Sequence, residues 1–306
     1  MKCFVAPLQG FTDDLFRRAY ADIFGTPDRF FTPFIRVERG QLRVRDVRGV
    51  TSELNQGLNV VPQIIFRDTD EFDMLISRLK ETGADHIDIN MACPFPPQVH
   101  KGRGAGMLLR PEFLETLKGR LSELEDIKFS VKMRLGVDDS ADYRHIMGII
   151  NDMQLEHVTI HPRIASQQYA GETDMNEFSR FLDSCRHPVI YNGDITEPSQ
   201  IDSIAGRYPG IAGVMAGRGL IARPSLFAEW NEGAEWDEEK RATQLLKLHD
   251  ALMSGALERL SGDRQILAHL QPYWEYFGRN FERRQVKALL KARTVEKYIQ
   301  ALGNLR

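Results

Sequence analysis

The sequence has few cysteines, with three in 306 residues and no Cys-x-x-Cys pair. Cys3, Cys93 and Cys185 are too widely spaced to resemble a structural zinc site or the disulfide framework of a small secreted domain. The low cysteine content therefore predicts reduced thiols and no bound metal.

Long hydrophobic runs are absent as well. No stretch approaches the ~20 consecutive apolar residues that a membrane-spanning helix needs. The apolar run at residues 3–8 is also shorter than the core of a secretory signal peptide. We therefore expect a cytoplasmic protein that is not associated with a membrane.

The chain also lacks a strong overall charge. It carries 40 basic and 43 acidic side chains, and its net charge of −3 argues against a generally basic nucleic-acid-binding protein. The basic residues are nevertheless clustered: residues 29–48 contain six arginines and two acids, and residues 264–306 contain nine basic residues and three acids. Each segment taken alone is better explained as a solvated face, but both are candidates for binding an acidic partner.

Short β-rich segments alternate with helical segments over most of the chain. Eight such segments, rich in Val, Ile and Phe, lie at residues 3–8, 30–35, 60–66, 86–90, 129–135, 157–161, 188–192 and 213–216. Their low charge indicates parallel strands that are buried on both faces. Helix-capping residues precede the helices expected at 15–24, 71–81 and 113–124. Eight strand–helix units predict an α/β fold of the TIM (β/α)8 barrel type, although a doubly wound sheet would give a similar alternation.

The pattern changes towards the C-terminal end. No strand signal remains there, and apolar residues recur at helical spacing from Leu245 onward. This predicts a small all-α helical bundle with breaks near Gly262 and Gly278. We therefore expect two domains, a barrel over residues 1–232 and a helical domain over residues 233–306.

Polar side chains recur at the predicted C-terminal ends of the strands. In a TIM barrel these ends and the loops after them carry the reactive groups. One buried lysine or histidine would ordinarily be structural, but a polar group at nearly every strand end favours a functional site. The candidates are Gln9, Gln63, Asn90, Cys93, Lys132, Arg134, His161, Arg163, Asn192, Asp194 and Arg218.

Cys93 is the leading candidate for a reactive group. It follows a short apolar strand and precedes Pro94, which ends the strand, so its thiol is expected at the mouth of the barrel. The alternative is a packed cysteine, because free cysteine is among the most buried residue types. The polar groups at the other strand ends favour the reactive role.

Glycines near the seventh and eighth strands predict an anion site. Gly193 and Gly217 allow backbone N–H groups to approach a ligand, and Arg218 follows directly. TIM barrels often hold a phosphate at this place, which favours a phosphorylated cofactor. Either glycine taken separately is better explained as part of an ordinary turn. No Gly-x-Gly-x-x-Gly or Walker loop follows the first strand, which disfavours a Rossmann-type site.

The segments at the strand ends form a set that can be compared with known families. They are Ala6-Pro7-Leu8-Gln9-Gly10, Pro62-Gln63, Asn90-Met91-Ala92-Cys93-Pro94, Gly104-Ala105-Gly106-Met107, Ser130-Val131-Lys132-Met133-Arg134, His161-Pro162-Arg163 with Tyr169, Asn192-Gly193-Asp194-Ile195 and Gly217-Arg218-Gly219. In this order and spacing they resemble the tRNA-dihydrouridine synthase family, FMN-dependent enzymes that reduce uridine in RNA. The resemblance covers the whole chain, because the family also carries a C-terminal helical domain.

The resemblance implies an FMN site, with NADPH (or NADH) as the reductant. The implied FMN contacts are Pro7, Leu8 and Gln9 beside the ring, Gln63 and Lys132 at its polar edge, and Asn192, Gly193, Asp194, Gly217 and Arg218 at the phosphate. His161 would contact the flavin or the bound base. A cation such as Lys132 at the ring's polar edge would stabilise the negative charge of reduced flavin.

The resemblance also implies the chemistry on the RNA. Uridine would leave its stack and enter the barrel mouth, hydride would pass from flavin N5 to C6, and Cys93 would protonate C5 as the general acid. This role needs a thiol that keeps its proton, so a strongly lowered pKa would be counterproductive. Asn90 would bind the polar edge of the uracil, and Arg134 and Arg163 are further expected substrate contacts.

Two basic surfaces are expected to bind the RNA backbone. Arg283, Lys287 and Lys291 are spaced to share one helix face, while Arg36 belongs to the basic loop that would contact the other side of a folded RNA. The nearby aromatic residues Tyr273, Trp274 and Tyr276 are better explained as bundle core. We expect a monomer that binds tRNA.

Some positions depart from the family pattern. The loop after Cys93 is longer than usual, with Gln98 where a lysine is common, and Met175 stands where a tryptophan is frequent. Pro162 and Ile164 replace the usual glycine and threonine. In appearance the chain is closest to the branch that modifies position 16 of the tRNA D-loop.

Two other functions stay open. An FMN-dependent enzyme of small molecules, such as an ene-reductase or a dihydroorotate-type dehydrogenase, would not need the basic C-terminal helix. A non-catalytic RNA-binding protein on the same fold would be colourless when purified, or would leave RNA dihydrouridine unchanged when Cys93 is replaced.

Overall fold

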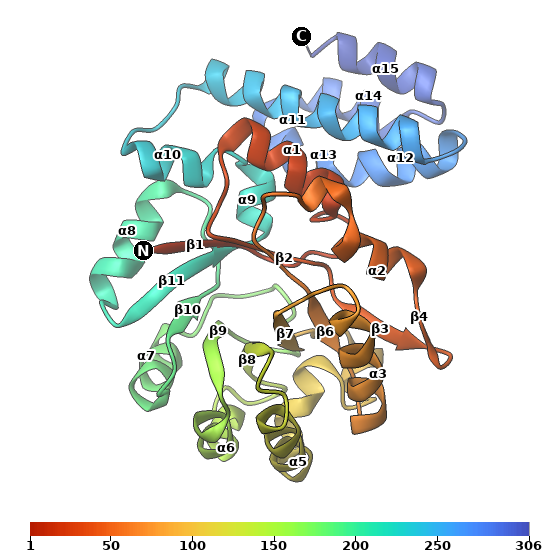
Figure 1. Ribbon diagram of the computed structural model, residues 1–306. Helices are drawn as coiled ribbons and strands as arrows, with labels where there is room; N and C mark the ends of the chain where they lie inside the picture. The colour runs from red at the N-terminus through yellow and green to blue at the C-terminus, as the bar shows by residue number, and fades with distance from the viewer. Residues whose placement is uncertain (306) are drawn as a thin grey trace.

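Parallel strands form the centre of the structure (Figure 1). The computed structural model describes residues 1–305. Its strands are β1 (Lys2–Val5), β2 (Arg29–Phe31), β3 (Ile35–Glu38), β4 (Gln41–Leu42), β5 (Val60–Val61), β6 (Gln63–Ile65), β7 (His86–Met91), β8 (Lys128–Gly136), β9 (Leu155–Ile164), β10 (Val189–Tyr191) and β11 (Ile211–Ala216). The short strand β4 pairs antiparallel with β3, whereas the other neighbouring strands pair in parallel.

The parallel strands close into a ring. β2 and β3 are two pieces of one strand position and β5 and β6 are two pieces of the next, because Pro33 and Pro62 lie at the interruptions and cannot donate a ladder hydrogen bond. β2 pairs with β5, and β3 pairs with β6. β1 completes the ring by pairing with β2 on one side and β11 on the other. These pairings confirm the TIM (β/α)8 barrel that the sequence predicts.

Helices follow the strands and cover the outside of the barrel (Figure 1). They are α1 (Asp14–Phe24), α2 (Val44–Thr51), α3 (Thr69–Lys80), α4 (Pro96–Val99), α5 (Pro111–Ser122), α6 (Met147–Asp152), α7 (Met175–Ser184), α8 (Pro198–Arg207), α9 (Arg218–Ala222) and α10 (Leu226–Glu232). Local capping sets their starts: Asp13 accepts a hydrogen bond from the N–H of Phe16 at 2.9 Å, and Asp68 accepts one from Glu71 at 2.9 Å. Among residues 1–305, no helix is both long and apolar enough to cross a bilayer.

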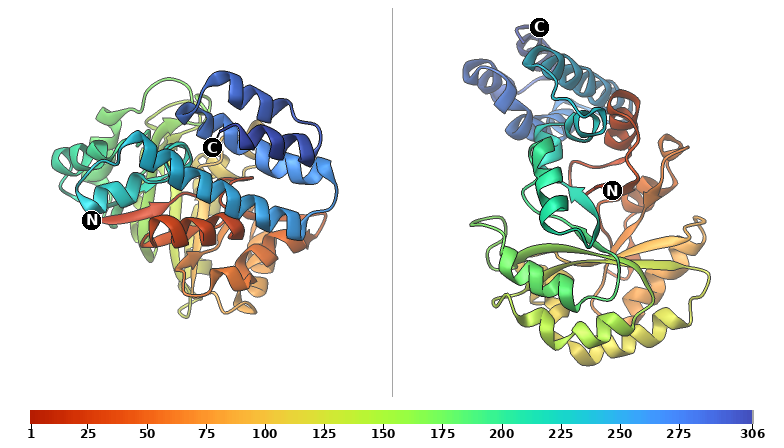
Figure 2. Two further views of the ribbon diagram at one scale, coloured as in Figure 1. Left: turned by 90° about the horizontal axis from the view of Figure 1, so that it is seen from above. Right: turned by 90° about the vertical axis from the view of Figure 1, so that its left-hand side faces the viewer.

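The last part of the described chain is helical, as predicted. It contains α11 (Glu238–Arg259), α12 (Asp263–Leu270), α13 (Trp274–Phe277), α14 (Arg283–Lys291) and α15 (Val295–Gly303). Figure 2 shows these helices gathered at one side of the barrel, with α11 alongside α1. Arg259 on α11 forms an ion pair with Asp14 at 2.8 Å, and the hydroxyl of Tyr273 donates to the carbonyl oxygen of Phe11. Tyr273 and Trp274 are buried, as expected for core residues.

The interior of the barrel is apolar on one side and polar on the other. Six buried side chains pack together inside it, namely Phe4, Ala6, Phe31, Val61, Ile190 and Met215. On β7, β8 and β9, by contrast, polar side chains alternate with aliphatic ones, as in Ser130, Lys132 and Arg134 on β8. Because successive side chains of a strand point to opposite faces, these polar groups share one face and lead towards the C-terminal mouth.

Candidate active site

A cavity of about 1030 Å³ opens at the C-terminal ends of the barrel strands. Most of the residues predicted from the sequence line it: Pro7, Leu8, Gln9, Arg36, Asn90, Cys93, Lys132, Arg134, His161, Arg163, Asn192, Gly193, Asp194, Gly217 and Arg218. The cavity also reaches the C-terminal helices, which contribute Tyr276 and Arg279. The barrel fold thus gathers groups that are far apart in the chain around one space large enough for a cofactor and part of a substrate.

Four predicted residues lie away from the cavity wall. Gln63 is fully buried and its amide bonds to Asn90 and Asp88, so it supports the wall from below. Arg283, Lys287 and Lys291 are exposed on α14 and do not line the cavity. The predicted contact of Gln63 with a flavin and the predicted contacts of the α14 residues with RNA stay predictions.

The structure brings to the cavity aromatic and basic groups that were not predicted as site residues from the sequence. Tyr169 lies under the guanidinium of Arg218, whose central carbon is 4.0 Å from the ring centroid, which is close enough for a cation–π contact. Phe95, next to the Cys93–Pro94 turn, lines the cavity and is 57% exposed. The prediction that Tyr276 belongs to the bundle core is wrong, because this side chain is only partly buried and lines the cavity together with Arg279, one of the basic residues of the segment 264–306. Their place at the cavity depends on how the helical part packs on the barrel.

Cys93 occupies a turn that other residues hold tightly. The side-chain oxygen of Asn90 accepts hydrogen bonds from the backbone N–H of Ala92 at 3.0 Å and of Cys93 at 2.8 Å, which bends the chain after β7. Gly104 (φ +56°) lies against this turn, and a Cβ there would be 2.7 Å from the Cβ of Cys93. Only glycine therefore fits beside the cysteine.

The surroundings of Cys93 keep its thiol protonated. Burial raises the pKa of the Cys93 thiol, and this effect outweighs the opposing influence of the Phe95 backbone N–H and of the Arg134 and Arg36 charges. A thiol of this kind is a poor nucleophile and a suitable proton donor at neutral pH.

Lys132 and His161 are buried bases on the same wall. Burial, assisted by the charge of Arg134, lowers the pKa of Lys132 to about 7, while Asp88 opposes this shift. Burial also lowers the pKa of His161 well below its usual value, with Lys132 and three arginines adding to the effect. The Nε2 atom of His161 lies 3.1 Å from a nitrogen of Arg163. Because a guanidinium can only donate, we assign Nε2 as the acceptor and the imidazole as neutral.

Asp194 connects two arginines beside the cavity. Arg163 donates to its carboxylate at 3.0 Å and to the carbonyl oxygen of Gly171 at 2.7 Å, and a guanidinium nitrogen of Arg218 lies 3.7 Å from the same carboxylate. A carboxylate repels a phosphate, so Asp194 is better suited to orienting Arg218 than to contacting the anion itself. The two terminal nitrogens of Arg163 are likewise engaged by protein partners, which leaves its Nε as the remaining donor.

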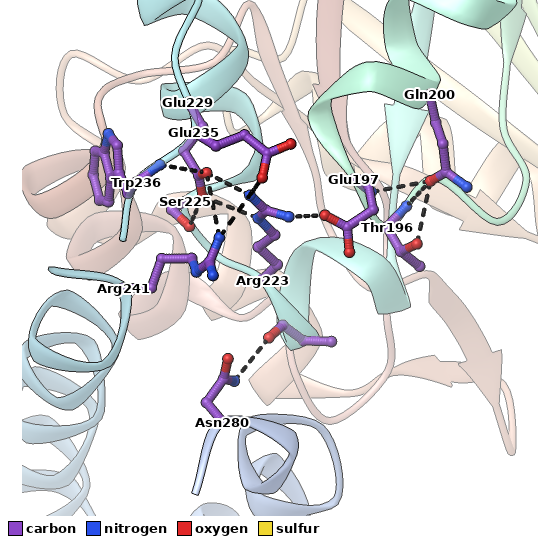
Figure 3. Close-up of polar contacts among 11 residues, drawn as sticks. Thr196, Glu197, Gln200, Arg223, Ser225, Glu229, Glu235, Trp236, Arg241 and Asn280 are labelled. Carbon is purple, nitrogen blue, oxygen red and sulfur yellow. Dashed lines mark hydrogen bonds and ion pairs between the residues drawn. The ribbon is translucent and has the colours of Figure 1, made fainter. Parts of the chain in front are cut away.

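A polar cluster centred on Arg223 connects segments on either side of α9 (Figure 3). Arg223, just after α9, donates to the buried carboxylate of Glu229 at 3.0 Å and also contacts Glu197 in the loop that precedes α8. Glu229 accepts a further hydrogen bond from the N–H of Trp236 at 2.9 Å, and Arg241 of α11 lies 3.8 Å from it. The cluster thus joins the loop after β10 to the first C-terminal helix.

The residues of the cavity fit a planar cofactor that carries a phosphate. Ala6 and Met215 give an apolar floor, and the Arg218 side chain supplies a cation. A Cβ on Gly219 would lie 1.8 Å from the carbonyl oxygen of Ile195. The loop after β10 and the start of α9 therefore approach so closely that no side chain fits between their backbones. The Nε atom of Arg163 is buried and has no hydrogen-bond partner among the described residues. This donor set suits FMN.

Comparison with known proteins decides the family. The family model described as "Dihydrouridine synthase (Dus)" matches residues 4–303. The chain belongs to the dihydrouridine synthase family. The resemblance seen in the strand-end segments is therefore confirmed at the level of the family. The enzymes of this family are oxidoreductases.

Curated relatives and solved structures agree with this placement. A "Probable tRNA-dihydrouridine synthase" from Mycobacterium tuberculosis (strain ATCC 25618 / H37Rv) is 30% identical over 68% of this chain, and the aligned part spans 56% of that relative. "tRNA-dihydrouridine synthase B" from Pasteurella multocida (strain Pm70) is 27% identical over 74% of this chain and 68% of its own length. The match therefore spans little more than half the length of the mycobacterial relative.

The fold of this dihydrouridine synthase family member is shared with more distant proteins. Morphinone reductase superposes with a TM-score of 0.53 at 13% identity, over 77% of this chain and 87% of that one. A variant of NCR from Zymomonas mobilis gives a TM-score of 0.53 at 13% identity, over 77% and 88% of the two chains. At this identity the similarity shows the fold alone.

Proposed function

We propose that this protein reduces the C5=C6 bond of a uridine in tRNA to give 5,6-dihydrouridine, with FMN as its cofactor and NADPH (or NADH) as the reductant. The observation that carries the proposal is the position of the Cys93 thiol on the wall of a large cavity that Lys132 and Arg218 also line. Burial raises the pKa of this thiol, as a proton donor requires. Membership of the dihydrouridine synthase family supports the same reaction.

The two ends of the cavity have different tasks in this proposal. Arg218, placed by Asp194, and the backbone around Gly193 and Gly217 would bind the phosphate of FMN. Lys132 would lie at the polar edge of the ring, where the negative charge of the reduced flavin would raise the lowered pKa of this lysine and favour its protonated form. When bound, FMN supplies the hydride that adds to C6 of the uracil.

Cys93 would supply the proton that completes the reduction. Its Sγ holds the proton at neutral pH because burial raises the pKa of the thiol, and it would pass this proton to C5 of the base. Asn90 lines the cavity, and its amide nitrogen, which donates one hydrogen to Gln63, would use the second for the polar edge of the uracil. The stacked base cannot reach this cavity, so the uridine would have to leave its stack.

The tRNA would be held by basic groups around and beyond the mouth. Arg36 and Arg279 line the cavity, while Arg283, Lys287 and Lys291 are exposed on α14. These groups are suited to sequence-independent contacts with phosphates, which position an RNA without reading its bases. Within tRNA we propose the D-loop as the target, with position 16 as the first uridine to examine.

The proposal is tested with tRNA from a strain that lacks the gene. We expect the purified protein with FMN and NADPH to form dihydrouridine at one site of this tRNA, and Cys93→Ala to slow the reaction roughly 100-fold or more, as loss of a general acid does. Cys185→Ala is the matched control, because Cys185 is a partly buried thiol away from the cavity.

Three results would contradict the proposal. They are a colourless protein that does not bind FMN, equal turnover of the wild type and Cys93→Ala, and reduction of small enones at rates that tRNA does not match. The last result would favour a reductase of small molecules.

A further inference from the structure

A continuous series of buried hydrogen bonds runs through the barrel to the Cys93 turn. The hydroxyl of Ser130 donates to Oδ1 of Asp88 at 2.6 Å, and the amide nitrogen of Gln63 donates to Oδ2 of the same carboxylate at 2.7 Å. The amide nitrogen of Asn90 then donates to Oε1 of Gln63 at 2.7 Å. The oxygen of Asn90 accepts the N–H groups of Ala92 and Cys93.

The series can point in only one direction. Two backbone N–H groups converge on the side chain of Asn90, so its oxygen must face them and its nitrogen must face Gln63. Gln63 must then present its oxygen to Asn90 and its nitrogen to Asp88. The amide nitrogen of Gln63, at the end of this pair of amides, therefore needs an acceptor. A carboxylate accepts and does not donate, so Asp88 provides the matching group.

We propose that Asp88 is a positioning residue for Cys93, acting through the amides of Gln63 and Asn90. It accepts the hydrogen bond from the amide nitrogen that Gln63 must present, and it thereby anchors both amides in the orientation that the turn after β7 requires. The anchored turn holds the thiol at the cavity wall. The consequence for catalysis rests on the proposed function, whereas the effect on the turn does not.

Stability alone gives no reason for a carboxylate at this place. Asp88 is fully buried on β7 between Ile87 and Ile89, and taking a charge out of water is unfavourable unless its partners compensate. They do not compensate fully, because burial raises the pKa of Asp88 to about 7 although Ser130, Gln63 and the charge of Lys132 oppose this shift. Hydrophobic residues of similar volume often replace buried polar groups without loss of stability. A role in orienting the residues above it explains why a carboxylate is present.

The first experiment measures the turn itself in flavin-free protein. Asp88→Leu keeps the branched shape but removes both acceptors, and we expect amide hydrogen exchange at Ala92 and Cys93 to become roughly tenfold faster, because their acceptor is no longer held in place. Asp88→Asn can still present an oxygen to Gln63, so it should restore most of the protection. Asp85→Asn removes an exposed carboxylate next to the same strand and is the matched control.

The second experiment separates the two half-reactions of the loaded enzyme. Asp88→Leu should slow the transfer to tRNA about tenfold or more while leaving reduction of the flavin by NADPH within about twofold of the wild type, because only the transfer to tRNA needs the thiol in place. Asp88→Asn should again recover most of the rate. A purely structural defect would slow both steps together.

A further variant covers the case in which Asp88→Leu does not fold. Gln63→Met removes the middle link at nearly the same side-chain length and should reproduce the faster exchange at Ala92 and Cys93. Exchange at wild-type rates in both Gln63→Met and a folded Asp88→Leu would overturn the proposal. Faster exchange together with a wild-type protein that does not modify tRNA would instead support the positioning role and overturn the proposed function.

Discussion

Arg218 shows how single residues acquire their role from their neighbours. Its guanidinium lies over the ring of Tyr169 on one side and near the carboxylate of Asp194 on the other. These two contacts restrict a flexible side chain to one place beside Gly193 and Gly217. A restricted arginine is suited to binding a phosphate, because little side-chain entropy is lost when the ligand arrives.

We predict that Arg218→Gln weakens FMN binding without affecting the binding of riboflavin, which lacks the phosphate. A charge-assisted hydrogen bond contributes about 1.5–3 kcal/mol, so the Kd for FMN should rise roughly 10- to 100-fold. Fluorescence titration of the flavin-free protein with each flavin measures this difference. An equal loss of affinity for both flavins would show that Arg218 contacts the ring or supports the fold instead.

At the scale of elements, the cluster around Glu229 connects the barrel with the C-terminal helices (Figure 3). Glu229 of α10 lies between Arg223 and Arg241, and the side chain of Glu229 is fully buried. Burial tends to raise the pKa of Glu229, but its donors, with Arg223 foremost, lower it below the usual value. The charged form is therefore the one that the cluster stabilises.

We predict that Glu229→Gln lowers the free energy of unfolding by about 1–3 kcal/mol, because Arg223 loses its fully buried partner and keeps only the more exposed carboxylates of Glu197 and Glu235. Glu235→Gln is the control: Glu235 contacts the same two arginines but is 60% exposed in its side chain. For this exposed residue the loss should stay below about 1 kcal/mol. Urea denaturation measures both, and equal losses would contradict the assignment of Glu229 as the centre of the cluster.

On the scale of the whole molecule, burial lowers the pKa of histidines inside the barrel as well as of His161 at the cavity. His86 and His157 are buried in the barrel with their rings 5.8 Å apart. Burial, with Arg29 and Lys128 adding to it, lowers the pKa of His86 to about 3. Burial and the neighbouring His86 likewise lower the pKa of His157 to about 3. Both rings are therefore neutral in the folded protein and protonate in the unfolded chain near pH 6.5.

We predict a loss of stability on mild acidification that depends on these histidines. Below about pH 6.5 the unfolded chain binds more protons than the folded one, so the free energy of unfolding falls with pH by up to about 1.4 kcal/mol per unit for each histidine. The double variant His86→Gln/His157→Gln should flatten this dependence between pH 7.5 and 5. His145→Gln, at an exposed site, should not. Identical slopes in all three proteins would contradict the prediction.

Local sequence was enough to predict the barrel and most of its mouth. Strand patterning and capping residues act over a few positions, so the eight strand positions and the starts of α1 and α3 follow from neighbours in the chain. A parallel barrel then places every strand end at one rim. For this reason the sequence alone predicts that Asn90, Cys93 and Lys132 line one cavity, as they do.

What each polar group faces was decided by the tertiary structure. Gln63 lies below the cavity wall because Asp88 and Asn90 on the adjacent strand match its amide, and Arg163 bonds Asp194 from another strand end. Tyr276 reaches the cavity only because the C-terminal helices pack at this end of the barrel. The sequence by itself determined which residues arrive at the barrel mouth, because strand periodicity is local. Contacts between strands that are remote in sequence decided which of these residues line the cavity and which support its wall from behind.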